Sequence, residues 1–473
     1  MRIAATSLLL SALLFAAPSL ALAEEASLMP LSPASAPAEA TQPPPAPKAT
    51  PAVAAAAPDL PTLEPHASLQ TLVLFRNDGD FDRTKPYYDP DGQEVGAAAT
   101  ILTPDILWRP TRSLRLFYQA ELGLNFWGKQ SVDAQGASPD VFVLRHKELY
   151  GEGEIGPAGF KLGFSEFQDA TGLFVHHWIG VAQLRWFFAP EGQAEVFFGQ
   201  VPDQTWEGVN VLENNFTRDI FVYGAKARYA FSEALELTVA LHAVWDSHVV
   251  GQVRRVFCPN LELVGKKGIV SGSLDLALQA GRFSGTALGG GDQDLLAWAA
   301  QGRVEVEAGP VRLQLNALAL SPDGDYDGGP TTGAFLYSGK SRSATLMLTE
   351  DEVRNWYDSF DLRMASFHDG FYANRAGLFV GDLKATLDVV DGFAPSLIVG
   401  AAATLNPNNS LGESFVGVET GLLLEYRFNQ YLRFHGLIEG FFPGGAGAAL
   451  VNAIDLSRTD PVFQGELSVA LRY

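Results

Sequence analysis

Strict alternation of apolar and polar residues is the feature of this chain that most restricts its fold. In residues 114–126 the apolar side chains fall at nearly every second position, and charged residues such as Arg115 and Glu121 lie between them. The same pattern recurs at 235–246 and 418–428. Successive side chains of a β-strand point to opposite faces, so a period of two predicts strands with one apolar and one polar face.

The chain has no apolar run long enough for a membrane helix after its N-terminal leader, although 47% of its residues are hydrophobic and only 18% are charged. A membrane helix needs about 20 such residues in succession. The alternating segments have ten or more residues and carry aromatic side chains near their ends. These features predict strands that cross a bilayer at a tilt, with aromatic residues at the two membrane interfaces.

Short and long connections alternate along the chain, as in outer-membrane β-barrels. Long polar segments lie between the short turns, and the longest of them is 322–374. Together with a first strand near 68–77 and a last strand near 463–473, eight hairpins predict eighteen strands and two termini on the periplasmic side. The short turns are expected at 109–113, 156–159, 190–193, 232–233, 265–267, 309–310, 391–393 and 429–430.

The N-terminal residues 1–23 have the features of a secretory signal peptide. A basic Arg2 precedes an apolar run at 7–17, and Ala21 and Ala23 supply small residues at a cleavage site. A leader of this kind directs a chain out of the cytoplasm and is removed. We therefore expect a secreted protein, located in the outer membrane.

The rest of the chain divides into a spacer and one domain. Residues 24–66 are rich in Pro and Ala and predict a disordered periplasmic spacer. Residues 67–473 predict a single all-β domain, a transmembrane antiparallel β-barrel of about eighteen strands. Its last strand alternates and ends on the aromatic Tyr473, a signal that barrel-assembly machinery reads in outer-membrane barrels.

A series of short motifs near the C-terminus resembles the alginate-export family of outer-membrane barrels. A Gly-x-Glu pattern at 417–419, a strand-closing Tyr426, a turn at 429–430 and a Phe-x-Pro-Gly pattern at 441–444 follow in that order. A looser match runs from 198 to 224. The resemblance implies an eighteen-stranded monomer that passes an exopolysaccharide outward.

The polar face of the strands is expected to line an aqueous channel, since the apolar face meets lipid. Acidic and basic residues are nearly equal in number on this face, which predicts cross-strand ion pairs and little charge selectivity. A neutral, zwitterionic or partly cationic polymer is therefore the expected cargo. The predicted pore-lining residues are Arg115, Glu121, Arg185, Lys226, Arg228, Glu305, Arg312, Lys384, Glu419, Glu425, Arg427, Arg433, Glu439, Glu466 and Arg472. Those proposed to contact cargo are Lys226, Arg228, Arg427, Arg433 and Arg472.

Nothing in the sequence predicts a catalytic residue, a metal site or a cofactor. No nucleophile elbow, P-loop or metal-binding histidine spacing occurs. The cluster of His242, Asp246 and His248 is expected to hydrate a strand end, and the single cysteine, Cys258, is expected in a loop or at a strand end. The formal net charge of −21 argues against nucleic acid as a partner.

These observations predict an outer-membrane channel that exports an exopolysaccharide. The partners expected are the lipid bilayer, the polysaccharide cargo, the barrel-assembly machinery and periplasmic export proteins. Two alternatives stay open: a general or small-solute porin, and a hydrolase acting at the membrane rim. Segment 322–374 is too long for an ordinary turn, and it either folds inward as a plug or lies outside as a flap.

Overall fold

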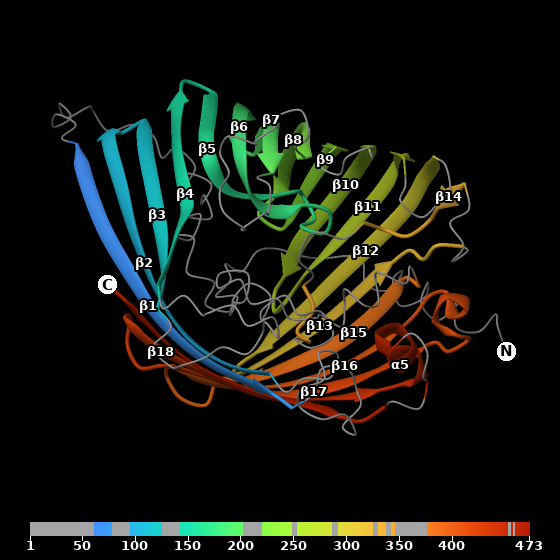
Figure 1. The fold of residues 1–473 in the computed structure, drawn as a ribbon. Helices are drawn as coiled ribbons and strands as arrows, with labels where there is room; N and C mark the ends of the chain where they lie inside the picture. Colours follow the sequence, from blue (N-terminus) through green and yellow to red (C-terminus); the bar gives the residue numbers. More distant parts are fainter. Residues whose placement is uncertain are drawn as a thin grey trace.

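The structure is a computed structural model that describes residues 61–77, 95–124, 142–201, 220–247, 253–285, 292–324, 330–336, 342–345, 376–452, 456 and 459–473. Within these residues nineteen strands pair in one sheet, and one of them, β14, has only two residues. The other eighteen pair with their neighbours in antiparallel fashion, and β1 pairs with both β2 and β19, so the sheet closes into a barrel (Figure 1). The predicted fold class and strand number are confirmed.

The long strands have between 10 and 17 residues, which is enough to cross a bilayer at a tilt. They are β1 (Thr62–Arg76), β2 (Val95–Thr111), β3 (Leu114–Leu124), β4 (Phe142–Ile155), β5 (Ala158–Gln168), β6 (His176–Ala189), β7 (Gly192–Val201), β8 (Ile220–Ser232), β9 (Leu235–Asp246), β10 (Val253–Lys267), β11 (Val270–Ser284), β12 (Gln293–Ala308), β13 (Val311–Leu320), β15 (Leu378–Leu387), β16 (Phe393–Ala403), β17 (Phe415–Arg427), β18 (Leu432–Pro443) and β19 (Val462–Arg472).

The remaining elements lie in the long connections. The two-residue strand β14 (Thr331–Thr332) pairs in parallel with β12, the helical turn η2 (Pro407–Ser410) follows β16, and helix α5 (Gly445–Asn452) follows β18. Among the described helices none is long and apolar enough to cross a membrane. We call the end of the barrel that carries these elements the long-loop end, and the opposite end the short-turn end.

All eight predicted hairpin turns are present, and they gather at the short-turn end. One is displaced: the turn expected at 265–267 lies at 268–269, between β10 and β11. Gly268 has a φ of +62° there, a backbone conformation that favours glycine. The alternation of short and long connections was therefore a sound guide to the fold.

The first strand begins earlier than predicted. The spacer was expected to extend to residue 66, but β1 starts at Thr62 and residues 62–66 pair with β2. Pairing with β19 starts only at residue 67. Pro65 therefore lies where one strand edge has no partner, and a proline, which has no N–H group to donate, is tolerated at such an edge.

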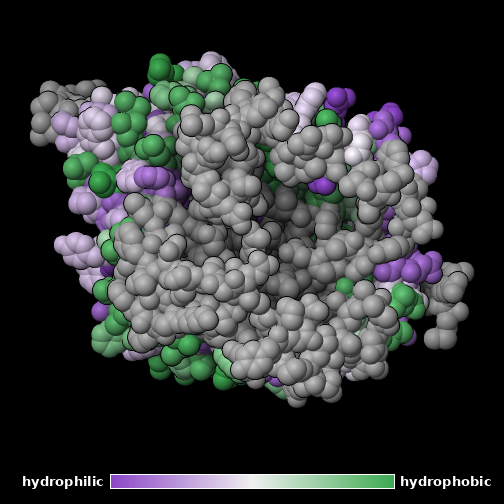
Figure 2. Space-filling view, in the orientation of Figure 1, coloured by the Kyte–Doolittle hydropathy of each residue, from purple (hydrophilic) through white to green (hydrophobic). Residues whose placement is uncertain are grey.

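The outer face of the barrel is apolar. Along β12 and β13, for example, Leu296, Trp298, Leu313 and Leu315 are 42–70% exposed, whereas the residues between them are turned inward. In the space-filling view, apolar residues appear along the outer edge of the described wall (Figure 2). This arrangement is typical of barrels whose outside is solvated by lipid.

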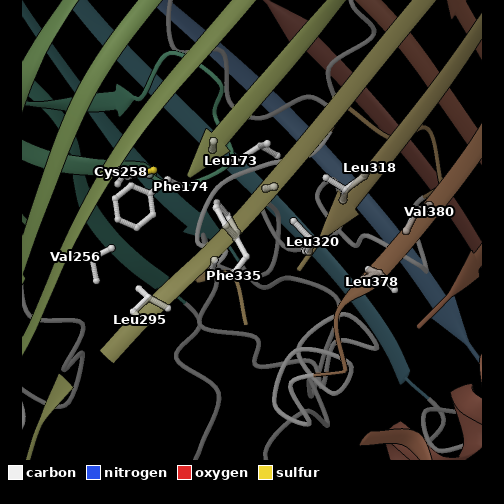
Figure 3. Close-up of a cluster of buried hydrophobic side chains, with 14 of the residues drawn as sticks. Leu173, Phe174, Val256, Cys258, Leu295, Leu318, Leu320, Phe335, Leu378 and Val380 are labelled. Carbon is white, nitrogen blue, oxygen red and sulfur yellow. The ribbon is translucent and has the colours of Figure 1, made fainter. Parts of the chain in front are cut away.

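The inner face is not polar throughout, which corrects the expectation of a polar lining along the whole strand. At the long-loop end, inward side chains of strands between β5 and β19, including those of β10–β15, form a buried apolar cluster with residues of the long connections, among them 173–175 and Phe335 (Figure 3). Phe335 is 1% exposed and lies among Leu295, Leu318 and Leu320. The alternation fails here because these strands pack against apolar chain on the inside and expose apolar residues on the outside.

Candidate functional site

The fifteen predicted pore-lining residues all lie on strands, on the face opposite the exposed apolar side chains. Their exposure differs widely. Glu419 and Glu439 are 0% and 1% exposed, whereas the side chain of Arg115 is 36% exposed. That these residues line a conducting passage stays a prediction, and their contacts indicate what each of them does.

A belt of alternating charges crosses the inner faces of β3, β4, β6, β7 and β8 near the short-turn end. The Glu152 carboxylate accepts hydrogen bonds from Arg115 and from Arg185, the latter at 3.2 Å. Arg185 Nε lies 3.8 Å from Glu195 Oε2, and Lys226 Nζ lies 3.7 Å from Glu195 Oε1. Three cations alternate with two carboxylates in this belt, and because each side chain faces one of opposite charge, the belt fixes the strand register.

The belt continues to β9 through a bidentate ion pair. Arg228 Nε and Nη2 donate to the two carboxylate oxygens of Glu236 at 2.5 and 2.6 Å. Arg228 and Lys226 were predicted to contact cargo, and in the structure both form ion pairs with the wall. Their contact with cargo stays a prediction.

On the opposite side of the barrel, three inward cations lie within electrostatic range of one carboxylate. The positive charges of Lys384, Arg312 and Arg433 act on Glu425. Arg433 lies directly opposite Arg427 in the β17–β18 register. Arg312 also pairs with Glu307 at 3.6 Å, whereas Arg427 and Arg433 are like charges placed directly opposite each other, which repel unless an anion or water intervenes. This group is a better candidate for solute contact than the paired belt.

Further ion pairs complete the wall on either side of that group. Arg303 Nη2 lies 3.0 Å from Glu305 Oε2, and Arg312 Nε lies 3.9 Å from Glu305 Oε1. On β18 and β19, His435 Nε2 lies 3.7 Å from Glu466 Oε1. These pairs follow the mixed-charge pattern that the sequence predicts.

Part of the long connection between β13 and β15 lies against the inner wall. We call residues 330–336 and 342–345 the inner strap. The Arg342 guanidinium donates to Glu262 and to Ser273, and its Nε lies 3.4 Å from Asp275 Oδ2. Its backbone N–H donates to Gln301 Oε1 at 2.6 Å. The described part of the predicted 322–374 segment thus folds inward, and residues 325–329, 337–341 and 346–375 lie outside the described residues.

Beyond Arg342, the strap reaches two further strands, β15 and β16. Ser343 Oγ donates to Asp382 Oδ2 on β15 at 2.7 Å, and Asn316 on β13 donates to the other oxygen of Asp382 at 2.6 Å. Thr345 is fully buried and its methyl group lies where a Cβ at Gly400 on β16 would stand, at 2.2 Å. Described residues of the strap therefore contact the inner faces of β10, β11, β12, β13, β15 and β16.

A second connection, 169–175 between β5 and β6, also folds inward. Asp169 accepts hydrogen bonds from the backbone N–H groups of Thr171, Gly172 and Phe174. Burial raises the pKa of this carboxyl to about 6, and the N–H donors only partly oppose the shift. Its Oδ2 lies 3.5 Å from Asn260 Nδ2 on β10. The connection is therefore held by its own turn and by the wall.

Two expectations about single residues were wrong. His242 was expected to hydrate a strand end, but it is 1% exposed, and its Nδ1 lies 2.8 Å from Asn260 Nδ2. Asp246 lies at the end of β9 and pairs with Arg254 at 3.7 Å, and His248 is outside the described residues. Cys258 was expected in a loop or at a strand end, but it lies within β10 and is 0% exposed. Both errors come from the inward-folded connections, which bury mid-strand residues.

The fold matches solved outer-membrane porins. Acinetobacter baumannii OccAB4 aligns with a TM-score of 0.53 at 10% identity, covering 87% of this chain and 98% of that chain. Pseudomonas aeruginosa OpdK with vanillate aligns at 0.52 and 13%, over 87% and 98%. Pseudomonas aeruginosa OccK2 (OpdF) in complex with glucuronate aligns at 0.51 and 11%, over 87% and 96%.

No family model and no curated protein matches the chain. The resemblance to the alginate-export family is therefore not supported, and the similar structures described above are Occ porins. The motifs at 417–444 consist of glycine, aromatic and turn residues, which barrel strands and hairpins need in any family. The resemblance also implied eighteen strands, and this number is correct. The hairpin pattern predicts the same number without the resemblance.

Sequence reasoning missed the residues that hold the strap. Asp275 and Asp382 occupy inward positions in alternating strands, so the period-two pattern could have identified them. Arg342 lies in a segment without periodicity, and nothing in its sequence neighbourhood indicates its partners.

Proposed function

We propose that the protein is an outer-membrane channel that admits small polar solutes. Two features support a channel: a closed barrel with an apolar exterior, and an inner wall with rows of paired charges. A hydrated, charge-lined interior that is closed to lipid is the arrangement in which polar solutes cross a membrane barrel.

The inner strap is the observation that most favours small solutes over a polymer. Its described residues occupy the interior against six neighbouring strands, and the apolar cluster fills the long-loop end of the same sector. Chain packed inside the wall narrows the space for cargo. A polymer would need this space along its whole path, whereas a small solute needs only a local opening.

The porins of similar fold support the same proposal. Two of them were crystallised with vanillate and with glucuronate, which are both small organic acids. The cation group of Arg312, Lys384 and Arg433 around Glu425 is where a small anionic or zwitterionic solute would meet the wall of this barrel. We therefore place solute contact there rather than at the paired belt.

Liposome swelling with a graded series of sugars tests the proposal. Purified protein is expected to admit monosaccharides quickly, disaccharides more slowly and longer oligosaccharides hardly at all. Equal rates across the series, or loss of surface polysaccharide on deletion of the gene, would instead favour polymer export.

The hydrolase alternative has less support. Its suggested residue, His242, is buried behind Asn260 and the rings of Phe167 and Phe197, so it lies away from the membrane rim. Replacing His242 with Gln is expected to leave any lipid-hydrolysing background of the preparation unchanged.

A further inference from the structure

We propose that the outer surface of β9–β11 carries a binding site for the phosphorylated headgroup of a membrane lipid. Its residues are Trp245, Arg255 and Arg282, which lie on three neighbouring strands near the long-loop end (Figure 1). The site is on the outside of the barrel and is separate from the proposed solute path. The inference therefore does not depend on which solute the channel admits.

The three side chains form one row because of the strand register. Arg255 on β10 lies directly opposite Trp245 on β9 and directly opposite Arg282 on β11. Trp245 is 40% exposed, the side chain of Arg282 is 59% exposed, and Arg255 is also exposed. The next residues along the two arginine strands, Val256 and Phe283, are buried. Successive side chains of a strand point to opposite faces, so the row lies on the outer face.

The height of this row on the barrel matches the edge of a bilayer. On the outer face of β10, every position between Arg255 and the exposed Lys267 is apolar or glycine. About 12 residues of strand, at about 3.3 Å each and with a tilt of about 40°, cover about 30 Å along the membrane normal. The hydrocarbon core of a bilayer is about 30 Å thick. Arg255 and Lys267 therefore lie at its two boundaries, where lipid headgroups begin.

The two arginines keep hydrogen-bond donors for an anion. The Arg255 guanidinium lies over the Trp245 ring, 4.6 Å from the ring centroid, and it pairs with no carboxylate among the described residues. Arg282 Nη2 donates to Asp292 Oδ2 at 2.9 Å. A guanidinium has five N–H donors, and like charges placed directly opposite each other repel. A phosphate between the two side chains would accept hydrogen bonds from both and would remove the repulsion.

An apolar surface for acyl chains lies next to the row, towards the short-turn end. Phe257, Leu278 and Leu296, on β10, β11 and β12, are 46%, 55% and 70% exposed. A free phosphate gains nothing from these side chains, whereas a lipid covers them with its acyl chains. The combination fits a molecule with a phosphate above an apolar tail. Long loops face outward in outer-membrane barrels, so this lipid belongs to the outer leaflet.

Two neighbouring carboxylates oppose anion binding. Asp294 on β12 is exposed and lies directly opposite Arg282, on the side away from Arg255, and Asp292 already accepts a hydrogen bond from Arg282. Both compete with a phosphate for that arginine. Arg255 is therefore the stronger contact of the two. Removal of the Asp294 charge should strengthen binding, whereas removal of either arginine charge should weaken it.

Native mass spectrometry of the full-length barrel, titrated in non-ionic detergent with lipid A or with its dephosphorylated form, tests the site. The unmodified protein should bind lipid A about tenfold more tightly than the dephosphorylated form. Arg255→Gln should weaken binding of lipid A about tenfold, Arg282→Gln about threefold, and Asp294→Asn should strengthen it about threefold. None of the three changes should alter binding of the dephosphorylated form, because only the phosphate contacts these charges.

A matched control is Lys267→Gln, which removes the same charge from the outer face of the same strand, at its other end. Its affinity for lipid A should equal that of the unmodified protein, because Lys267 lies in a hairpin and not beside a second cation of the row. Inorganic phosphate serves as a competitor that carries the anion without the tail. At concentrations equal to that of lipid A it should displace none of the bound lipid.

Three results would overturn the proposal. Equal affinity of the unmodified protein for the two forms of the lipid would mean that the row is only an interfacial anchor. Unchanged affinity in both arginine variants, with heat-modified migration on a gel showing that they are folded, would place lipid A elsewhere on the barrel. Displacement of lipid A by an equal concentration of inorganic phosphate would mean that the arginines bind the free anion and that the apolar surface plays no part.

Discussion

Neutralising either Arg228 or Glu236 alone is expected to change the charge selectivity of the channel. Neutralising both residues is expected to restore it. The two side chains meet on the inner faces of β8 and β9 at 2.5 and 2.6 Å, with 38% of the arginine and 12% of the glutamate side chain exposed. Glu236→Gln leaves one positive charge on the wall, and Arg228→Gln leaves one negative charge. The double variant leaves neither.

The size of the effect follows from Coulomb's law. A unit charge about 10 Å from a permeating ion interacts with it by about 0.8 kcal/mol at an effective dielectric constant of about 40, between the values for a protein surface and for water. Screening over a Debye length of about 10 Å at 0.1 M salt lowers this to about 0.3 kcal/mol. Because one ion is favoured and its counter-ion is disfavoured, the ratio of their permeabilities changes by about 0.6 kcal/mol, or about threefold.

Reversal potentials in a KCl gradient measure this ratio directly. Glu236→Gln should raise the chloride-to-potassium permeability ratio about threefold, Arg228→Gln should lower it about threefold, and the double variant should match the unmodified protein. Asp292→Asn, on the outer face, serves as a control that changes the net charge without changing the ratio. If the two single variants shift the ratio in the same direction, or leave it unchanged, this stretch of wall does not face the conducting path.

Three further predictions concern single residues. Cys258, which is 0% exposed, should not react with a maleimide in the folded barrel and should react fully after unfolding in hot detergent. Gly392→Ala should lower the free energy of unfolding by about 1–3 kcal/mol, because this residue has a φ of +81° and the new Cβ would meet Arg427 O at 2.3 Å. Gly156→Ala is the control, since Gly156 also has a positive φ but no atom lies within 4 Å of the new Cβ, and it should lower the free energy of unfolding by less. Urea titration compares the two variants. Burial raises the pKa of Asp169 from 3.8 to about 6, so between these pH values the folded state binds a proton that the unfolded state does not. The free energy of unfolding should therefore fall by about 3 kcal/mol as the pH rises from about 4 to above 6. Thermal unfolding of Asp169→Asn should not show this dependence on pH.

The sequence predicted those parts of the fold that depend on local pattern. Alternating residues such as Leu114–Leu124 specified strands, and the turn residues between them specified hairpins, so the strand number followed from arithmetic. Both signals are properties of neighbouring residues, which is why they can be read without a structure. The start of β1 was missed because proline is more often a linker residue than an edge-strand residue.

The site was predictable only where it depends on which face of a strand a residue lies on. Alternation placed Arg185 and Arg228 on the inner face, and adjacent hairpins made their pairing with acidic residues a reasonable hypothesis. The partners of Arg342 were not predictable, because the residues it contacts lie up to 80 positions away in the sequence and its own segment has no period. One signal was available but unused: the run at 295–300 is apolar at every position, which indicates a strand that is buried on both faces.

Strands β10–β15 are apolar on both faces at the long-loop end, and this explains how one barrel can contain both a stable internal packing and the proposed solute path. On β10–β15 the inner face is apolar at the long-loop end, so chain that folds inward is held there by burial, as Phe335 and Leu173 are. Towards the short-turn end the same strands carry paired charges, and burial can no longer hold the chain. The described part of the strap follows this change in the wall, because Phe335 makes apolar contacts at the long-loop end and Arg342 makes ionic contacts with Glu262 and Asp275.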